Sequence, residues 1–384
     1  MKIAFLTPEY PHEITRASGG IGTSIKNLAE SLVSNGHSVR VLVYGQDKEE
    51  FFTDKDIVVQ RINSVKIKGL SWYFTRKKLE KIIDKLYAEK EIDLLEAPDW
   101  TGITSFIQPE KCPVVIRLNG SDTYFCHLDN RPVKWINRFH EKRALQKADA
   151  YISVSKYTAS LTNQLFNQNN KFTIIPNSIN CNNFNFTLLE EDSSKQIILY
   201  FGTLIRKKGL LELPYIFNKI MDKHPNVQLQ LVGRDSPDII SGNSSTWSMM
   251  QAMFSNKALN NVTYIGGVSH NEIKEYISRA TICVFPTFAE ALPLSWLEAM
   301  AMRKAIVASD IGWAEEIIQN GINGYLANPK DHQGYADKIN LLLENKDLAN
   351  QIGINARLRI EEAFDAKKVV IQNVEFYKNS IRKK

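Results

Sequence analysis

Short apolar runs alternate with amphipathic segments along most of this chain, in two successive series. A strand that is covered on both faces of a parallel sheet reads as a continuous apolar run, and the helices between such strands make the crossovers. The pattern therefore predicts two α/β units, each with a parallel sheet. The runs lie at 2–7, 39–44, 57–62, 93–96, 113–118 and 150–154 in the first series, and at 197–201, 227–232, 262–266, 281–285 and 305–309 in the second.

The boundary between the two series lies at residues 177–196, which are rich in Asn, Ser and acidic residues and lack helical periodicity. A chain of 384 residues is also too long for one comfortable hydrophobic core. We therefore predict a first domain over 1–176, a linker over 177–196 and a second domain over 197–363, followed by a helical stretch over 364–384.

Several protein classes are excluded by composition. No window approaches the roughly 18 consecutive apolar residues of a membrane span, and the short apolar run at the N-terminus predicts a buried strand, not a signal peptide. The net charge of +6 suggests an anionic ligand or surface but is too small for a dedicated nucleic-acid binder. The four cysteines are far apart, which argues against a zinc site or a disulfide framework and favours a reduced, cytoplasmic setting: Cys112, Cys126, Cys181 and Cys283.

A glycine-containing loop follows the first apolar run. Ser18, Gly19 and Gly20 precede a helical stretch at 21–35. Glycines permit the close approach of a ligand, and the first turn of a helix offers unpaired N–H groups to an anion. A G-x-G-x-x-G dinucleotide fingerprint is absent. The loop is either a phosphate site or an ordinary tight turn.

The second series repeats this arrangement with added charge. Its first run is followed by Gly202 and then by Arg206, Lys207 and Lys208. Open α/β sheets bind ligands at the carboxyl ends of their strands, and Arg and Lys suit a diphosphate. A solvated basic turn is the alternative, but the position directly after a buried strand favours a ligand site.

Two glutamates flank the start of a helix in the second series. Glu290 lies in the loop before it, and Pro293, a residue favoured in the first helical turn, predicts where the helix begins. The N–H groups of Leu294 and Ser295 would then face a bound phosphate. Glu298 lies in an otherwise apolar helix, where a carboxylate requires hydrogen-bond donors. A ribose diol and a local backbone or Arg partner are the two candidates.

The segment 290–301 (EALPLSWLEAMA) resembles the E-x7-E element of retaining GT-B glycosyltransferases, specifically glycosyltransferase family 4. The resemblance covers about residues 1–365. It implies two Rossmann-like parallel-sheet domains that face each other across a cleft, and a final helix, about 366–381, that returns to the first domain. Further segments that match family elements in the family's order are 18–22 (SGGIG), 154–157 (VSKY), 175–178 (IPNS), 202–209, 231–233 (LVG), 265–268 (IGGV) and 321–326 (GINGYL).

The resemblance also implies roles for individual residues. Arg206 and Lys208 would neutralise the donor diphosphate. Glu290 would hold hydroxyls of the transferred sugar, and Glu298 would hold the nucleoside ribose. The other donor-binding positions that it implies are Gly19, Gly20, Gly202, Gly233, Gly267, Val268, Leu294 and Ser295.

Two positions depart from the family pattern. Thr203 stands where the family's GRL element has Arg, so that Arg206 would substitute for it. Asn119 stands where many members have a His that contacts the transferred sugar; Asn can donate a hydrogen bond but cannot carry a proton. Arg117 and Asp122 are the polar candidates for the acceptor side, and Asp122 is equally well explained as a turn residue.

The resemblance implies a retaining, metal-independent hexosyltransferase that moves a sugar from a nucleoside diphosphate sugar to an acceptor hydroxyl and needs no cofactor. Synthesis of a cell-surface polysaccharide, a lipopolysaccharide or a glycolipid is the expected setting, with a glycan or a lipid-linked acceptor. The alternatives are a binding protein for nucleotide-sugars or glycans, and an epimerase or a phosphorylase of the same fold.

A basic stretch at 66–90 predicts contact with an anionic membrane at its inner face. It contains eight cations against three acids, with Trp72, Tyr73 and Phe74 at its head and apolar residues at helical spacing. A basic helix with aromatic residues can lie on anionic lipid, although the same apolar face could simply pack on the sheet. Arg76, Lys77 and Lys78 are among the cations expected to face lipid.

Overall fold

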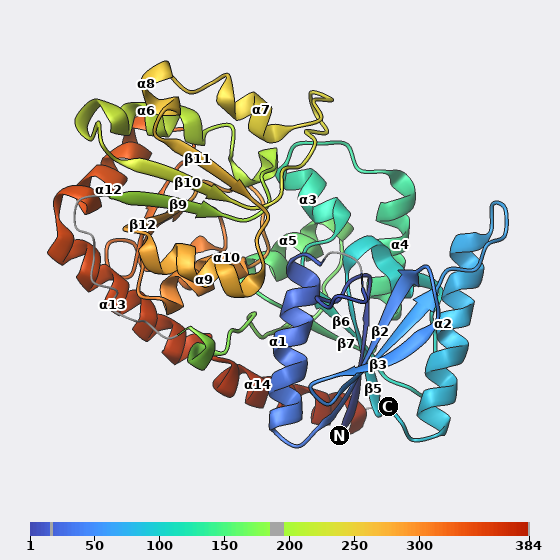
Figure 1. Cartoon of the computed structure of the whole chain (residues 1–384). Helices are drawn as coiled ribbons and strands as arrows, with labels where there is room; N and C mark the ends of the chain where they lie inside the picture. Colours follow the sequence, from blue (N-terminus) through green and yellow to red (C-terminus); the bar gives the residue numbers. More distant parts are fainter. Residues whose placement is uncertain (16–17, 185–195, 383–384) are drawn as a thin grey trace. The chain divides into compact units, whose positions relative to one another are not determined.

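The computed structural model describes residues 1–15, 18–184 and 196–382, so most of the predicted linker lies outside the described residues. The chain divides into two compact units. The first contains Met1–Ile179 and Asp365–Lys384, and the second contains Asn180–Phe364. Each unit is built around one largely parallel sheet with helices on both of its faces, as the two series of apolar runs predict (Figure 1).

The first sheet has the strand order β3-β4-β2-β1-β5-β6-β7-β8. All neighbouring strands are parallel except β3 and β4, which form an antiparallel hairpin at one edge. The strands are β1 (Lys2–Thr7), β2 (Ser38–Gln46), β3 (Glu50–Asp54), β4 (Ile57–Asn63), β5 (Leu94–Pro98), β6 (Val114–Leu118), β7 (Ala150–Ser153) and β8 (Thr173–Ile174).

Helices cover this sheet on both faces. Leu28 of α1 and Val369 of α14 belong to the core on one face, and Leu79 and Ile83 of α2 belong to the core on the other. The last helix, α14, thus lies beside α1 in the first unit (Figure 1). The helices are α1 (Gly20–Ser34), α2 (Ser71–Ala88), the 3-10 segment η1 (Trp100–Phe106), α3 (Asp122–Leu128), α4 (Trp135–Lys147), α5 (Lys156–Phe166) and α14 (Ala366–Arg382).

The second sheet is parallel throughout, with the order β11-β10-β9-β12-β13-β14. The chain moves from β9 outward to β11 and then returns to the other side of β9. β9 and β12 are therefore neighbours whose following loops run in opposite directions. Open α/β sheets bind ligands at such a point. The strands are β9 (Ile197–Phe201), β10 (Gln228–Val232), β11 (Val262–Gly266), β12 (Ile282–Phe285), β13 (Ala305–Ser309) and β14 (Tyr325–Ala327).

The helices of the second unit include α10 (Leu294–Ala301), which begins directly after Pro293, as predicted. No helix in the described part of the chain combines the length and the apolar character needed to cross a bilayer. The other helices are η2 (Cys181–Asn183), η3 (Arg206–Lys208), α6 (Leu213–Lys223), α7 (Thr246–Gln251), α8 (Asn256–Leu259), α9 (His270–Arg279), α11 (Ala314–Ile317), α12 (His332–Glu344) and α13 (Lys346–Ala363).

Candidate active site

The loops that follow β9 and β12 hold each other in place. The carbonyl of Lys207 accepts hydrogen bonds from the backbone N–H groups of Phe288, at 2.8 Å, and Ala289, at 3.2 Å. Gly209 has a φ of +70°, and a Cβ at this position would lie only 1.7 Å from the carbonyl oxygen of Pro286. Only glycine permits both this conformation and this approach. The glycine loop and the E-x7-E segment therefore form one rigid structure.

These two hydrogen-bonded loops place Lys208 next to Glu290. Lys208 Nζ lies 2.8 Å from Glu290 Oε1, and both side chains are half-buried. Burial is the largest single effect and would lower the pKa of Lys208, but Glu290, Tyr200 and Glu298 together outweigh it and raise the pKa, so the ammonium stays charged. The pair lies in a small pocket of the second unit, which is lined by Tyr200, Phe201, Lys208, Phe285, Thr287, Glu290, Pro293, Ser295 and Trp296.

The N-terminus of α10 opens on the same pocket. Pro293 is its N-cap and no side chain caps its first turn. The N–H groups of Leu294 and Ser295 occupy the first two positions of the helix, where N–H groups have no partner within the helix. Ser295 lines the pocket beside Lys208. An ammonium group and the positive end of a helix thus face one space, which suits an anion.

Glu298 lies one turn further along α10 and is 7% exposed. Burial raises its pKa to about 8, while the charges of Lys274 and Lys208 act in the opposite direction. A carboxyl group in this environment gains from any ligand that supplies hydrogen-bond donors.

Arg206 points elsewhere. Its Nε and Nη2 donate to the two carboxylate oxygens of Asp238, at 2.8 and 2.7 Å, and Asp238 is 2% exposed. This bidentate pair holds the pKa of Asp238 well below its usual range. Arg206 is not among the residues that line the pocket. In this structure it anchors the loop that carries Asp238, and Lys208 is the cation beside Glu290.

The remaining donor-binding candidates of the second unit lie at the carboxyl ends of β9, β10 and β11. The Cβ of any residue replacing Gly233 would lie 1.8 Å from the carbonyl oxygen of Gly202, so the two backbones are in contact. Gly267 lies against the side chain of Arg234, and Val268 follows it at half-buried depth. Their contact with a nucleotide base stays a prediction.

In the first unit, the start of α1 is occupied by a carboxylate. Glu9 Oε1 accepts the N–H of Gly22 at 3.0 Å, and a Cβ at Gly19 would lie 3.3 Å from the same oxygen. Glu9 thus holds an N–H group that a phosphate would otherwise use, next to Gly19 and Gly20. Glu9 follows the first strand by two positions and is not among the site residues predicted from the sequence.

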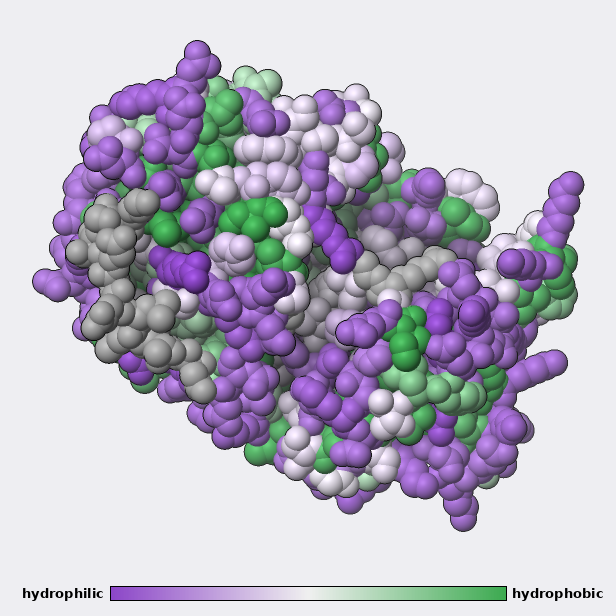
Figure 2. Space-filling model, in the orientation of Figure 1, coloured by the Kyte–Doolittle hydropathy of each residue, from purple (hydrophilic) through white to green (hydrophobic). Residues whose placement is uncertain are grey.

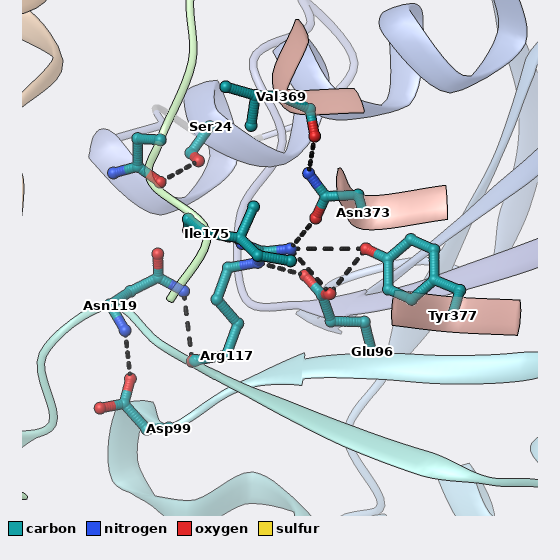
Figure 3. A network of polar contacts seen from close by, with 10 residues as sticks. Ser24, Glu96, Asp99, Arg117, Asn119, Ile175, Val369, Asn373 and Tyr377 are labelled. Atoms are coloured by element: carbon teal, nitrogen blue, oxygen red, sulfur yellow. Dashed lines mark hydrogen bonds and ion pairs between the residues drawn. The ribbon is translucent and has the colours of Figure 1, made fainter. Parts of the chain in front are cut away.

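Asn119 lies at the end of β6, and Asp99 lies at the end of the neighbouring strand β5. The backbone N–H of Asn119 donates to Asp99 Oδ1 at 2.9 Å, and Asn119 Nδ2 donates to the carbonyl of Arg117 at 3.4 Å (Figure 3). Within the described residues, Asp99 Oδ2 is buried with no hydrogen-bond partner. Burial raises the pKa of Asp99 to about 7. Asp99, which directly follows β5, is a second polar residue that is not among those predicted from the sequence.

The acceptor-side interpretation of Arg117 does not fit its surroundings. The guanidinium is 6% exposed and pairs with Glu96, with Nε 2.7 Å from Oε1. It lies between Glu96 of β5 and Asn373 and Tyr377 of α14 (Figure 3). Tyr377 in turn donates to Glu96 at 2.7 Å. Arg117 therefore fastens α14 to the sheet.

Asp122 is the first residue of α3 and accepts a hydrogen bond from Asn137 at 2.9 Å. The start of a helix is a sufficient structural explanation for Asp122, without a role on the acceptor side. In the described ranges 1–15, 18–184 and 196–382, no three His, Cys, Asp or Glu side chains are grouped so that they could hold a metal ion.

Comparison with known sequences identifies both halves. Residues 183–359 match the family Glycosyl transferases group 1, and residues 18–183 match Glycosyltransferase Family 4. An uncharacterised glycosyltransferase of Methanocaldococcus jannaschii is 27% identical over 398 residues, covering 98% of both chains. A glycogen synthase of Mycobacterium tuberculosis is 23% identical over 414 residues, covering 98% of this chain and 94% of its own.

Solved structures share the fold over the whole length. Sucrose-phosphate synthase from Thermosynechococcus elongatus has a TM-score of 0.82 at 19% identity, covering 100% of both chains. HepE of Anabaena, solved in complex with UDP-glucose, has a TM-score of 0.76 at 19% identity, covering 99% of this chain and 100% of its own. Because the two family matches together span residues 18–359, the chain belongs to glycosyltransferase family 4 and is a glycosyltransferase with the GT-B fold.

Proposed function

We propose that this glycosyltransferase moves a hexose from a nucleoside diphosphate sugar to an acceptor hydroxyl with retention of the anomeric configuration. The observation that carries the proposal is the Lys208–Glu290 pair beside the uncapped start of α10. One side of this pocket suits phosphate oxygens, and the Glu290 carboxylate suits the hydroxyls of a sugar. A nucleoside diphosphate sugar has both groups side by side.

In the transfer, the bond between the anomeric carbon and the donor phosphate oxygen breaks, and a bond to the acceptor oxygen forms. Negative charge grows on the departing diphosphate, and Lys208 with the N–H groups of Leu294 and Ser295 stabilises it. The acceptor proton passes to an oxygen of the departing phosphate. This route needs no protein base, which is consistent with Asn119 at the position where many family members have His.

Glu298 is proposed to bind the ribose. Both hydroxyls of a ribose diol can donate to one carboxylate, and such donors favour the ionised form. Binding would thereby remove the cost of a buried carboxylate on α10. HepE of Anabaena has been solved with UDP-glucose, which makes this the first donor to test.

The acceptor is proposed to be a glycan or a lipid-linked molecule in the synthesis of a cell-surface polysaccharide, a lipopolysaccharide or a glycolipid. No metal ion or other cofactor enters the proposed reaction. Cytoplasmic location and peripheral contact with an anionic membrane belong to the same proposal.

A thermal-shift screen of the purified chain with UDP, GDP, ADP and CMP tests the donor. A nucleotide at 100 times its dissociation constant stabilises the folded state by about 2.7 kcal/mol, and the shift should be smaller in Lys208→Met. The reaction is then run with the matching α-linked sugar donor. Nuclear magnetic resonance of the first product formed gives the anomeric configuration of the new linkage. An α-linked product supports retention, and a β-linked product would overturn it.

A further inference from the structure

The first unit exposes large apolar side chains at two places that adjoin. One is the loop and first turn at the N-terminal end of α2, and the other is the first turn of α4. Trp135 is 77% exposed and Trp72 is 41% exposed. Figure 2 shows hydrophobic colour over the N-terminal end of α2, at the right edge of the molecule. The exposed apolar side chains at the two places include Ile67, Leu70, Trp72, Trp135 and Phe139.

Ring contacts join the two places into one surface. Trp72 lies 5.4 Å from Phe106 of η1, and Phe106 lies 6.4 Å from Phe139, measured between ring centroids. Trp72 also lies 5.0 Å from His140 of α4. Residues 67–74, η1 and the start of α4 thus form one aromatic surface, called here the α2–α4 surface.

The structure corrects which cations accompany this surface. Arg76 is buried, and its guanidinium donates to the carbonyls of Ile103 and Trp72, so it braces α2 against η1 and does not face lipid. Lys77 pairs with Glu80 at 2.7 Å, and Lys78 pairs with Glu49. These three cations, expected from the sequence to bind membrane, are engaged within the protein.

Other cations remain at the surface. Lys66, Lys68 and Lys134 are exposed and flank the apolar side chains, whereas the exposed Arg138 donates to the carbonyl of Leu165 at 2.6 Å. Residues 64–79 and 130–140 contain no Asp or Glu. A surface with exposed tryptophans and cations and without acids matches an anionic bilayer, because Trp favours the headgroup level and Lys and Arg attract anionic lipid.

The location of the surface relates it to the candidate active site. α2 follows β4, and α4 precedes β7, so both helices begin at the carboxyl edge of the parallel sheet. Asp99 and Asn119 end their strands at this same edge, and η1 follows Asp99 directly.

We propose that the α2–α4 surface docks the first unit on an anionic membrane, with the aromatic side chains at headgroup level and the lysines on the lipid phosphates. Docking would bring the edge that carries Asn119 close to a membrane-borne acceptor. This last step rests on the proposed function, whereas docking itself is measured without any sugar transfer.

Co-sedimentation of the full chain with vesicles tests docking. Vesicles of phosphatidylcholine with one fifth phosphatidylglycerol should bind the protein at low salt, and pure phosphatidylcholine should bind it much less. Loss of one cation should weaken binding about fivefold, and each added Glu is repelled by anionic lipid, so the triple variant K66E/K68E/K134E should lose at least roughly 100-fold. Trp135→Ser with Phe139→Ser should also weaken binding, at unchanged charge.

A matched control separates the surface from general charge. Lys111, Lys147 and Lys171 are exposed and precede β6, β7 and β8, at the opposite edge of the same sheet. Their replacement by Glu makes the same charge change and should leave most of the binding. Equal loss in both triple variants, equal binding to the two vesicle types, or no binding at low salt would overturn the proposal. A dimer that dissociates on Trp135→Ser would instead identify a second copy as the occupant.

Lys208→Met keeps this test independent of the catalytic one. The variant should bind vesicles as the wild type does while losing transfer. If the wild type transfers sugar but does not bind vesicles, only the docking proposal fails.

Discussion

A glycine-containing loop follows the first strand in each sheet, but the helix starts at the two carboxyl edges differ. In the first unit, Glu9 accepts the N–H of Gly22 at the start of α1. Glu141, 1% exposed, accepts the N–H groups of Asp122 and Thr123 at the start of α3, at 2.8 and 3.1 Å. In the second unit, no side chain caps α10, and Lys208 lies at the pocket beside it.

The difference indicates which of the two units can bind an anion at a helix start. A helix start that is held by the protein's own carboxylate repels a further anion, whereas an uncapped start beside an ammonium group attracts one. The pocket of the second unit therefore has the features of a phosphate site, whereas the starts of α1 and α3 in the first unit do not.

The largest effect is expected at Lys208. Lys208→Met removes the cation proposed to face the departing diphosphate and leaves Glu290 without that partner. Turnover should fall about 10³-fold, the upper range for loss of one electrostatic stabiliser of a transition state. Initial rates with saturating donor measure it, and circular dichroism confirms folding.

Two neighbouring cations serve as controls for this prediction. Lys207 contributes its carbonyl to the loop contacts described above, so Lys207→Met should retain most activity. Arg206→Met should cost no more than about tenfold, because the partly exposed Arg206 is paired with Asp238. A loss at Arg206 as large as that at Lys208 would show that Arg206 leaves Asp238 to bind the donor.

The next effect concerns stability and pH in the first unit. The pKa of Asp99 is raised from about 4 in an unfolded chain to about 7 by burial. Below pH 4 both states are protonated. As the pH rises from 4 to 7 the unfolded chain ionises first, so the folded state loses stability, by about 1.4 kcal/mol per unit of pKa shift.

Asp99→Asn should remove this loss while keeping an acceptor for the N–H of Asn119. Urea unfolding at pH 4.5 and pH 8 should therefore show the variant gaining on the wild type by a few kcal/mol at the higher pH. A constant difference between the two proteins would mean that Asp99 is already ionised at pH 4.5.

A third effect concerns the affinity for the donor. Ionisation of Glu298 in the second unit should change donor affinity, whereas ionisation of Asp99 in the first unit should change stability. Glu298, with a pKa of about 8, is mostly protonated at pH 7, and the ribose hydroxyls proposed to donate to it favour the ionised form. Binding then releases a proton, so the Kd for UDP-glucose should fall by up to about tenfold per pH unit between pH 6.5 and 8. Titration calorimetry should find this slope in the wild type and none in Glu298→Gln. An equal slope in both proteins would assign it to another group.

The fold could be predicted well from the sequence because most strands are buried on both faces. Continuous apolar runs marked eleven of the fourteen strands in the described part of the chain, and Pro293 marked the start of α10. The three missed strands lack such a run. β3 is an edge strand whose residues alternate between half-buried and exposed, and β8 and β14 have only two and three residues.

The candidate site could be predicted only where the chain is locally rigid. Lys208 and Glu290 meet because two adjacent loops are bound to each other at the end of the sheet. Both Arg206 and Arg117 were placed at ligands, Arg206 from its position and the family resemblance and Arg117 as a polar residue beside Asn119, but their partners lie far along the chain. Asp238 is 32 residues from Arg206, and Tyr377 is 260 residues from Arg117.

One available signal concerned Arg117. Glu96 and Arg117 are opposite charges within apolar runs of the kind that form neighbouring strands, and a buried charge requires a partner. That pairing was open to inference from the sequence. The contact of both residues with α14 was not, because it depends on the return of the last helix to the first sheet.

The smallest effect is expected at Glu9, and it tests the comparison of the two helix starts most directly. Glu9→Gln removes the negative charge at the start of α1 but keeps an oxygen that can accept the N–H of Gly22. The charge contributes only about 0.3 to 1 kcal/mol at a helix terminus, so thermal unfolding should shift by a few degrees at most. Turnover should change less than about threefold, since Glu9 acts on the protein's own N–H group and not on the donor. Thermal denaturation and initial rates, measured beside Lys208→Met, give both numbers. A loss of turnover above tenfold would place Glu9 in the transfer reaction. It would also remove the distinction between the carboxylate-held helix start of the first unit and the uncapped start of α10.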